Sequence, residues 1–179
     1  MPVDANELQE RARRVRLLLL DVDGVLTDGT VSIDSSGGES KHFFIRDGIS
    51  LIWARRSGLT VGLLSGRSSA TTTRRAAELG ISIVSQGGPD KRVGYAEILG
   101  AHGYADEDVA YMGDDVLDLP VLGRVGLSTA PADAVDDVRT RVHWISQHAG
   151  GRGAVRELVE VVLQSQGHWA GIVNAFLKP

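Results

Sequence analysis

Acidic side chains stand where two apolar runs of the sequence end. Four leucines, residues 17–20, are followed directly by Asp21 and, two positions later, by Asp23, and Asp114 stands just behind a second apolar run. One carboxylate can attack a phosphorus atom and become an aspartyl phosphate. A second acid can protonate the departing alcohol and then activate water. These residue types therefore suit phosphoryl transfer if the fold brings them together.

A hydroxyl and an ammonium accompany the acids. Ser65 follows the apolar run 59–64, and Lys91 stands at the start of an expected helix. Like charges about 4 Å apart repel by roughly 4 kcal/mol at an effective dielectric constant near 20. A divalent ion that bridges the carboxylates and a phosphate removes this repulsion, and a site made of oxygen atoms suits Mg²⁺. Ser65 and Lys91 would then hold the phosphoryl oxygens.

The elements that must position these residues alternate between strand and helix. Consecutive leucines are typical of a strand buried on both faces, as in a parallel sheet covered by helices. We expect strands over residues 15–21, 59–64, 81–84, 108–112, 125–128 and 143–145, and helices over residues 4–14, 49–57, 68–79, 89–100, 115–122, 132–139 and 154–166. This order predicts an α/β fold with a doubly wound, Rossmann-like parallel sheet in a single domain, residues 1–179. Ligands bind beyond the carboxyl ends of such strands.

Two further segments lie outside this alternation. Two β-rich runs around a turn of Gly, Ser and Asp predict a β-hairpin over about residues 30–45, closed by residues 46–48. Phe43 and Phe44 make it apolar, so we expect it to pack against hairpins of other subunits. A C-terminal tail over about residues 167–179 should add one or two helical turns.

Composition excludes several classes of protein. The net charge is −4, and no segment collects enough Lys and Arg for a nucleic-acid surface. The absence of cysteine excludes disulfides and thiolate chemistry. The apolar run at residues 17–20 is too short for a signal peptide, and no stretch could span a membrane. We therefore expect a cytoplasmic protein that binds neither nucleic acid nor membranes.

Several motifs, taken together and in order, resemble a known superfamily. The matching segments are residues 21–29 (DVDGVLTDG), Ser65-Gly66-Arg67, Lys91 and residues 113–120 (GDDVLDLP), which are similar to the four motifs of haloacid-dehalogenase-superfamily phosphatases. Arg46-Asp47-Gly48, Tyr111 and residues 150–157 (GGRGAVRE) look like the 3-deoxy-D-manno-octulosonate 8-phosphate phosphatase family, and the likeness covers nearly all of residues 15–166.

The resemblance implies a role for each matching residue. Asp21 would be the nucleophile and Asp23 the general acid and base. Asp21, the main-chain carbonyl of Asp23, and Asp114 would bind Mg²⁺, while Ser65 and Lys91 would hold the phosphate. The positions that match substrate contacts are Asp23, Arg46, Asp47, Gly48, Arg67, Arg75 and Lys91. The resemblance also implies a fold without a cap domain and a homotetramer formed through the hairpin.

Two departures leave the substrate open. Phe44 stands where the family usually has Asn, and Ile52 where it often has Arg. A phosphorylated 3-deoxy sugar acid is the expected substrate, with a nonulosonate 9-phosphate or another sugar phosphate as alternatives. A phospho-accepting receiver domain is a competing hypothesis, but such domains lack an acid in the position of Asp23. A non-catalytic scaffold built on the hairpin is the third, although clustered unpaired carboxylates would destabilise it.

Single residues also have plainer explanations. An isolated Asp-x-Asp is more often a solvated turn, Ser65 could cap the helix expected at 68–79, and Lys91 could be an exposed helix lysine. We expect Asp115 and Asp118 to cap a helix and orient Asp114 rather than to bind the metal.

Arg152 lies in the glycine-rich segment 150–153. We expect this segment to be a mobile loop, because glycine permits extended and left-handed conformations. The guanidinium suits a carboxylate or a phosphate. Arg152 is therefore expected to reach a substrate-loaded active site, that of a neighbouring subunit.

Overall fold

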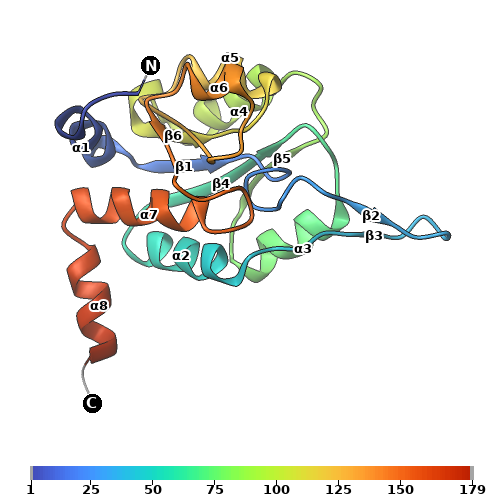
Figure 1. The fold of residues 1–179 in the computed structure, drawn as a ribbon, viewed down its shortest axis with the longest axis horizontal. Helices are drawn as coiled ribbons and strands as arrows, with labels where there is room; N and C mark the ends of the chain where they lie inside the picture. The colour runs from blue at the N-terminus through green and yellow to red at the C-terminus, as the bar shows by residue number, and fades with distance from the viewer. Residues whose placement is uncertain (1, 178–179) are drawn as a thin grey trace.

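The computed structural model describes residues 2–177 and contains one large parallel sheet (Figure 1). Its strand order is β5-β4-β1-β6-β7-β8. The strands of this sheet are β1 (Leu17–Leu20), β4 (Thr60–Ser65), β5 (Ile83–Gln86), β6 (Val109–Met112), β7 (Leu127–Ala130) and β8 (Trp144–Ile145). The helices are α1 (Ala5–Arg14), α2 (Ile45–Arg56), α3 (Ala70–Glu78), α4 (Lys91–His102), α5 (Leu119–Leu122), α6 (Asp136–Arg139), α7 (Ala154–Ser165) and α8 (Trp169–Leu177). The predicted doubly wound α/β fold is confirmed.

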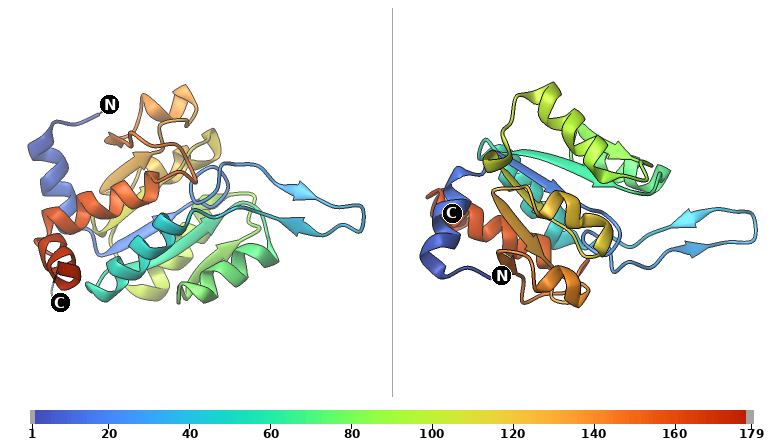
Figure 2. Two further views of the ribbon diagram at one scale, coloured as in Figure 1. Left: turned by 60° about the horizontal axis from the view of Figure 1, so that its bottom comes forward. Right: turned by 90° about the horizontal axis from the view of Figure 1, so that it is seen from above.

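Strand β1 lies in the middle of the sheet and explains the run of leucines. It pairs in parallel with β4 on one side and with β6 on the other. Leu18 and Leu20 belong to a core that includes residues of α1, α2 and α7, whereas Leu17 and Leu19 belong to a second core with residues of α4, α5 and α6. Helices therefore cover both faces of the sheet, as Figures 1 and 2 show, and the carboxyl end of β1 carries the acidic pair.

The hairpin protrudes from the sheet but is shorter than predicted (Figure 2). Its strands are two residues each: β2 (Ser32–Ile33) pairs antiparallel with β3 (Glu39–Ser40). Phe43 instead packs against the domain core, and α2 begins at Ile45, four residues before the predicted start. The prediction of strand over residues 41–45 was wrong: Phe43 packs against the domain core, Lys41 is buried there, and Ile45, which is 72% exposed, opens α2.

The other differences between the predicted and the observed elements concern where the elements begin and end. Strands β5 and β7 begin two residues later than predicted, and the helix expected at 115–122 is divided into a 3₁₀ turn, Val116–Asp118, and α5. In the expected tail, Trp169 of α8 packs edge-on against Trp53 of α2, with ring centroids 5.7 Å apart. The last two residues of that tail lie outside the described residues. No helix among residues 2–177 has the length and apolarity that a membrane span requires.

Candidate active site

The carboxyl ends of three neighbouring strands form one cleft. Asp21 and Asp23 follow β1, Ser65 ends β4, and Asp114 follows β6. These side chains line the cleft together with Lys91 from the start of α4. Residues up to 93 positions apart in sequence thus meet because parallel strands end at the same edge of the sheet.

Asp21 is buried and is fixed by contacts on both carboxylate oxygens. Oδ1 accepts a hydrogen bond from the amide of Val22 (2.7 Å), and Oδ2 lies 2.9 Å from the ammonium of Lys91. Burial and the nearby charge of Asp118 raise the pKa of Asp21 to about 6, although Lys91 opposes this rise. Burial also works against the charge of Lys91, but Asp21 and Asp118 outweigh it and raise its pKa. The lysine therefore stays protonated beside the expected nucleophile.

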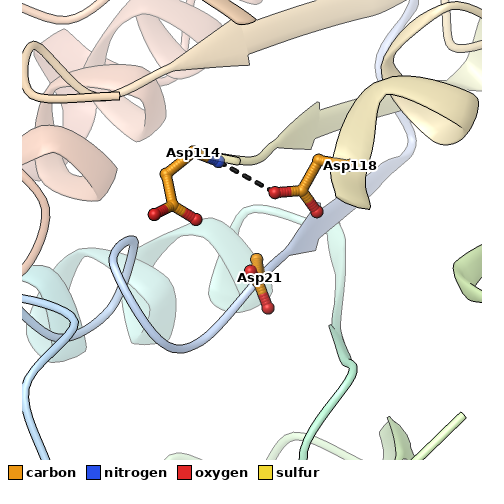
Figure 3. A group of neighbouring side chains, drawn as sticks. All are labelled: Asp21, Asp114 and Asp118. Atoms are coloured by element: carbon orange, nitrogen blue, oxygen red, sulfur yellow. Dashed lines mark hydrogen bonds between the residues drawn. The ribbon is translucent and has the colours of Figure 1, made fainter. Parts of the chain in front are cut away.

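Asp118 is fully buried and connects the cleft residues to one another. Its Oδ1 accepts hydrogen bonds from Lys91 (2.6 Å) and from the hydroxyl of Tyr111 (2.5 Å). Its Oδ2 accepts hydrogen bonds from the amides of Asp114 (2.9 Å) and Asp115 (3.1 Å). Figure 3 shows the bond from Asp114. Both oxygens are thus in use, which agrees with the expectation that Asp118 orients Asp114 rather than binding a metal.

Three carboxylates converge closely enough to share a metal ion (Figure 3). Asp21, Asp114 and Asp118 each offer an oxygen, and these oxygens lie within 4.8 Å of one another. Burial and the charges of Asp21 and Asp118 raise the pKa of Asp114 to about 8. Because Asp118 already accepts four hydrogen bonds, Asp21 and Asp114 are the side chains best placed to bind a divalent ion. Such an ion would offset the repulsion among the carboxylates, which adds to the effect of burial in raising both pKa values.

A glycine is required where the chain passes this acid cluster. Gly24 has a φ of +88°, and a Cβ atom there would lie 2.0 Å from Oδ2 of Asp114. Any side chain would therefore push Asp114 out of the cleft, so the glycine of the acidic motif serves both the turn and the site.

Sequence reasoning missed Lys41. This residue follows β3, its side chain has no exposed surface, and its Nζ lies 2.7 Å from Oδ1 and 3.0 Å from Oδ2 of Asp23. Nothing in the local sequence indicates this contact, because it forms only when the hairpin returns to the domain.

The plainer explanations for Ser65 and Lys91 are wrong. Ser65 is buried at the cleft and accepts a hydrogen bond from the amide of Arg67 (3.3 Å), whereas Ser69 caps α3. Lys91 opens α4 but has only 6% of its surface exposed. Both side chains are therefore available to the cleft rather than to solvent.

The expected substrate residues divide into two groups: Asp23, Lys91 and Arg67 line the cleft, and the rest do not. Arg67 is paired there with Glu39 at 2.8 Å. The rest lie away from the cleft: Asp47 is buried and accepts the amide of Arg156, Gly48 packs against Arg75, Arg75 lies over the ring of Phe43, and Arg46 and Arg152 line a separate hollow. Within one chain, the structure therefore brings Asp23, Lys91 and Arg67 to the cleft, but not the remaining expected substrate residues.

The glycine-rich segment 150–153 packs against the loop that follows β1. The amide of Gly151 donates to the carbonyl of Val25 (2.9 Å), and a Cβ atom on Gly150 would lie 1.8 Å from the carbonyl oxygen of Gly24. These glycines permit close contact between backbones, so our expectation that they provide mobility was wrong. The side chain of Arg152 is 66% exposed, with Nη2 3.4 Å from Oδ2 of Asp28.

Comparison with known proteins shows extensive similarity to one group of enzymes. The 3-deoxy-D-manno-octulosonate 8-phosphate phosphatase of Escherichia coli K12 is 42% identical over 166 residues, which cover 93% of this chain and 88% of the relative. The corresponding enzyme of Yersinia pestis is 40% identical over 167 residues, covering 93% and 89%. No family model matches the chain.

Solved structures of the same group superpose closely. The crystal structure of the Yersinia pestis enzyme has a TM-score of 0.92 at 40% identity, covering 94% of this chain and 91% of the other. The Moraxella catarrhalis enzyme, solved with magnesium, phosphate and a KDO molecule, has a TM-score of 0.94 at 35% identity, covering 97% and 99%. The Haemophilus influenzae enzyme, solved with cobalt, has a TM-score of 0.89 at 36% identity, covering 94% and 99%.

Proposed function

The chain belongs to the 3-deoxy-D-manno-octulosonate 8-phosphate phosphatase family of the haloacid dehalogenase superfamily, and from this premise we propose that it is a Mg²⁺-dependent phosphomonoesterase that works through an aspartyl phosphate on Asp21. The observation that carries the proposal is the meeting of Asp21, Asp23, Ser65, Lys91 and Asp114 in one cleft. Membership of a phosphatase family argues against a receiver domain and a non-catalytic scaffold.

Each side chain of the cleft has a task in this proposal. Asp21 attacks phosphorus, and Asp23 gives a proton to the leaving alcohol and then takes one from water. Lys91 and Ser65 hold the phosphoryl oxygens and stabilise their charge in the transition state. Lys91 already lies 2.9 Å from Asp21, so its ammonium is in place before a substrate arrives.

The carboxylate oxygens of Asp21 and Asp114 lie close enough to hold a divalent ion, and the family resemblance adds the main-chain carbonyl of Asp23. Magnesium in the Moraxella catarrhalis structure and cobalt in the Haemophilus influenzae structure support a metal in this family, and an all-oxygen site favours Mg²⁺. When bound, the ion would offset the repulsion among the carboxylates and the phosphate.

The proposed substrate is a phosphorylated 3-deoxy sugar acid such as 3-deoxy-D-manno-octulosonate 8-phosphate, the compound in the names of the relatives. The two departures from the family pattern, Phe44 and Ile52, do not line the cleft of their own chain. In this proposal they affect the substrate bound by another subunit. This agrees with the homotetramer, which we propose assembles through the hairpin.

A phosphate-release assay tests the proposal. The purified protein is mixed with 3-deoxy-D-manno-octulosonate 8-phosphate, a nonulosonate 9-phosphate and neutral sugar phosphates, each with Mg²⁺ and with excess chelator. We expect the highest kcat/KM for a sugar acid phosphate, loss of activity with chelator and recovery on adding Mg²⁺. Full activity in chelator contradicts the metal dependence, and preference for neutral sugar phosphates contradicts the substrate class.

A further inference from the structure

Residues 2–177 contain two lysines, and each is buried against one acid of the Asp-x-Asp pair. Lys91 contacts Asp21. Lys41 contacts Asp23 through both carboxylate oxygens and lies 3.4 Å from the hydroxyl of Thr72. The proposed function gives Lys91 a task but gives none to Lys41.

A buried ammonium is unfavourable unless a negative partner faces it. The side chain of Asp23 remains 19% exposed in the cleft, whereas that of Lys41 has no exposed surface. Lys41 is therefore shielded from solvent and, unlike Asp23, does not line the cleft. Among the residues that the structure describes, one other carboxylate lies near its Nζ, that of Glu39 at 3.8 Å. This arrangement suits a group that orients Asp23 rather than one that touches substrate.

The backbone that carries Lys41 is itself fixed at the base of the hairpin. Glu39, two residues earlier, accepts hydrogen bonds from Arg67 (2.8 Å) and from the hydroxyl of Ser69 (2.6 Å). The hydroxyl of Thr71 donates to the carbonyl of Glu39 (3.3 Å). The ammonium thus has a rigid support, as a group that positions a catalytic side chain needs.

We propose that Lys41 is a positioning residue for proton transfer by Asp23, and that it thereby connects the hairpin to the chemical step. This inference rests on the proposed phosphatase function. In the first step a bond forms from Asp21 to phosphorus, the ester oxygen leaves with the electron pair, and the proton of Asp23 moves to that oxygen. In the second step Asp23 takes a proton from water, whose oxygen binds phosphorus and displaces Asp21. Lys41 keeps its protons throughout and holds the carboxyl group of Asp23 in line with the leaving oxygen.

The leaving group provides the test. A sugar alkoxide must be protonated as it departs, whereas p-nitrophenolate leaves readily without a proton. The quantity to compare is kcat/KM, because it covers only the steps up to the aspartyl phosphate. In Lys41→Met, which keeps an unbranched side chain of similar length, we expect kcat/KM for the best sugar phosphate to fall about 100-fold. We expect the value for p-nitrophenyl phosphate to fall less than about 10-fold.

The matched control is Thr72→Val, which removes the other hydrogen-bond partner of Lys41 but keeps the ion pair with Asp23. Its ratio of the two kcat/KM values should stay near that of the wild type. Equal falls for both substrates in Lys41→Met, or no fall in either, would overturn the proposal.

If Lys41→Met does not fold, Lys41→Gln replaces it in the same assay, with the same expected result. A double substitution gives a further comparison. Adding Lys41→Met to Asp23→Asn should leave the ratio of the two kcat/KM values as it is in Asp23→Asn, and a further change in that ratio would overturn the proposal. A wild-type protein without Mg²⁺-dependent hydrolysis of any ester would refute the proposed function instead.

Discussion

The two acids best placed to bind the metal both have a raised pKa, and for the same reasons. Asp21 and Asp114 are removed from water, and each faces the charge of Asp118. The charge of Lys91 opposes the rise in both cases. A site with this imbalance of charge gains most from binding a divalent cation and then a phosphate whose oxygens Lys91 can reach.

Arg152 is the residue whose proposed role depends most on another subunit. Its exposed guanidinium shares a hollow with Arg46 and does not reach the cleft of its own chain. We predict that Arg152→Ala raises KM for an acidic sugar phosphate by about 10-fold, the loss expected for one charged hydrogen bond at about 1.4 kcal/mol. The KM for p-nitrophenyl phosphate, which has no carboxylate, should change much less. Arg139→Ala, another exposed arginine, is the control, and a similar change for both substrates would remove Arg152 from the site.

Sequence reasoning could find Asp21, Ser65, Lys91 and Asp114 because each stands at a strand end or helix start, where the fold fixes the position. It could not find Lys41, since the contact with Asp23 depends on the path by which the hairpin returns. The family resemblance implies that Asp47 contacts substrate, and within one chain Asp47 is buried and accepts the amide of Arg156.

At the scale of elements, Asp47 joins α2 to α7. Its Oδ1 accepts the amide of Arg156 in the first turn of α7 (2.8 Å), while its Oδ2 is buried without a hydrogen-bond partner. Burial raises the pKa of Asp47 to about 6 from an ordinary value of 3.8. The folded state therefore holds this proton at pH values where the unfolded chain has released it, and stability falls as pH rises through that window.

Asp47→Asn should remove this dependence, because an amide does not titrate. We predict that the free energy of unfolding of the variant minus that of the wild type rises by about 2 kcal/mol between pH 4 and pH 6 and is level above it. Urea unfolding at several pH values measures the difference. Asp34→Asn, in an exposed turn of the hairpin, is the control that should not show this rise. A difference that does not change with pH would contradict the role of Asp47.

The helix boundaries show why local pattern had limits at this scale. Residues 43–45 look like a strand because two are aromatic and one is β-branched, yet α2 begins at Ile45. Packing of Phe43 on the domain core, rather than local β-propensity, therefore determines the structure of this segment.

At the scale of the molecule, the hairpin is the feature that a single chain does not explain. It extends away from the sheet in every view, and Ile33 at its centre is 71% exposed (Figures 1 and 2). A short two-stranded hairpin has little stability of its own in water. Phe43 packs against the domain core, and Phe44 precedes α2, so both lie outside the protruding part of the hairpin. Ile33 is therefore the exposed apolar side chain of the hairpin that another subunit could cover.

We predict a homotetramer at micromolar concentration and its weakening in Ile33→Asp, which places a charge in the proposed interface. Light scattering after size-exclusion chromatography measures the mass of both proteins. Val93→Asp changes an exposed valine on α4, far from the hairpin in sequence, and should leave the mass unchanged. A wild-type monomer would contradict the assembly.

The central claim is that Asp21 attacks phosphorus, and trapping the phosphorylated protein tests it most directly. The wild-type protein is mixed with radiolabelled sugar acid phosphate and Mg²⁺, quenched in acid within the first turnover, and digested, so that the labelled peptide can be identified. We predict label on the peptide that contains Asp21, and no label, with kcat reduced at least about a thousandfold, in a folded Asp21→Asn protein. Phosphate release without a labelled protein, or unchanged turnover in Asp21→Asn, would contradict the account.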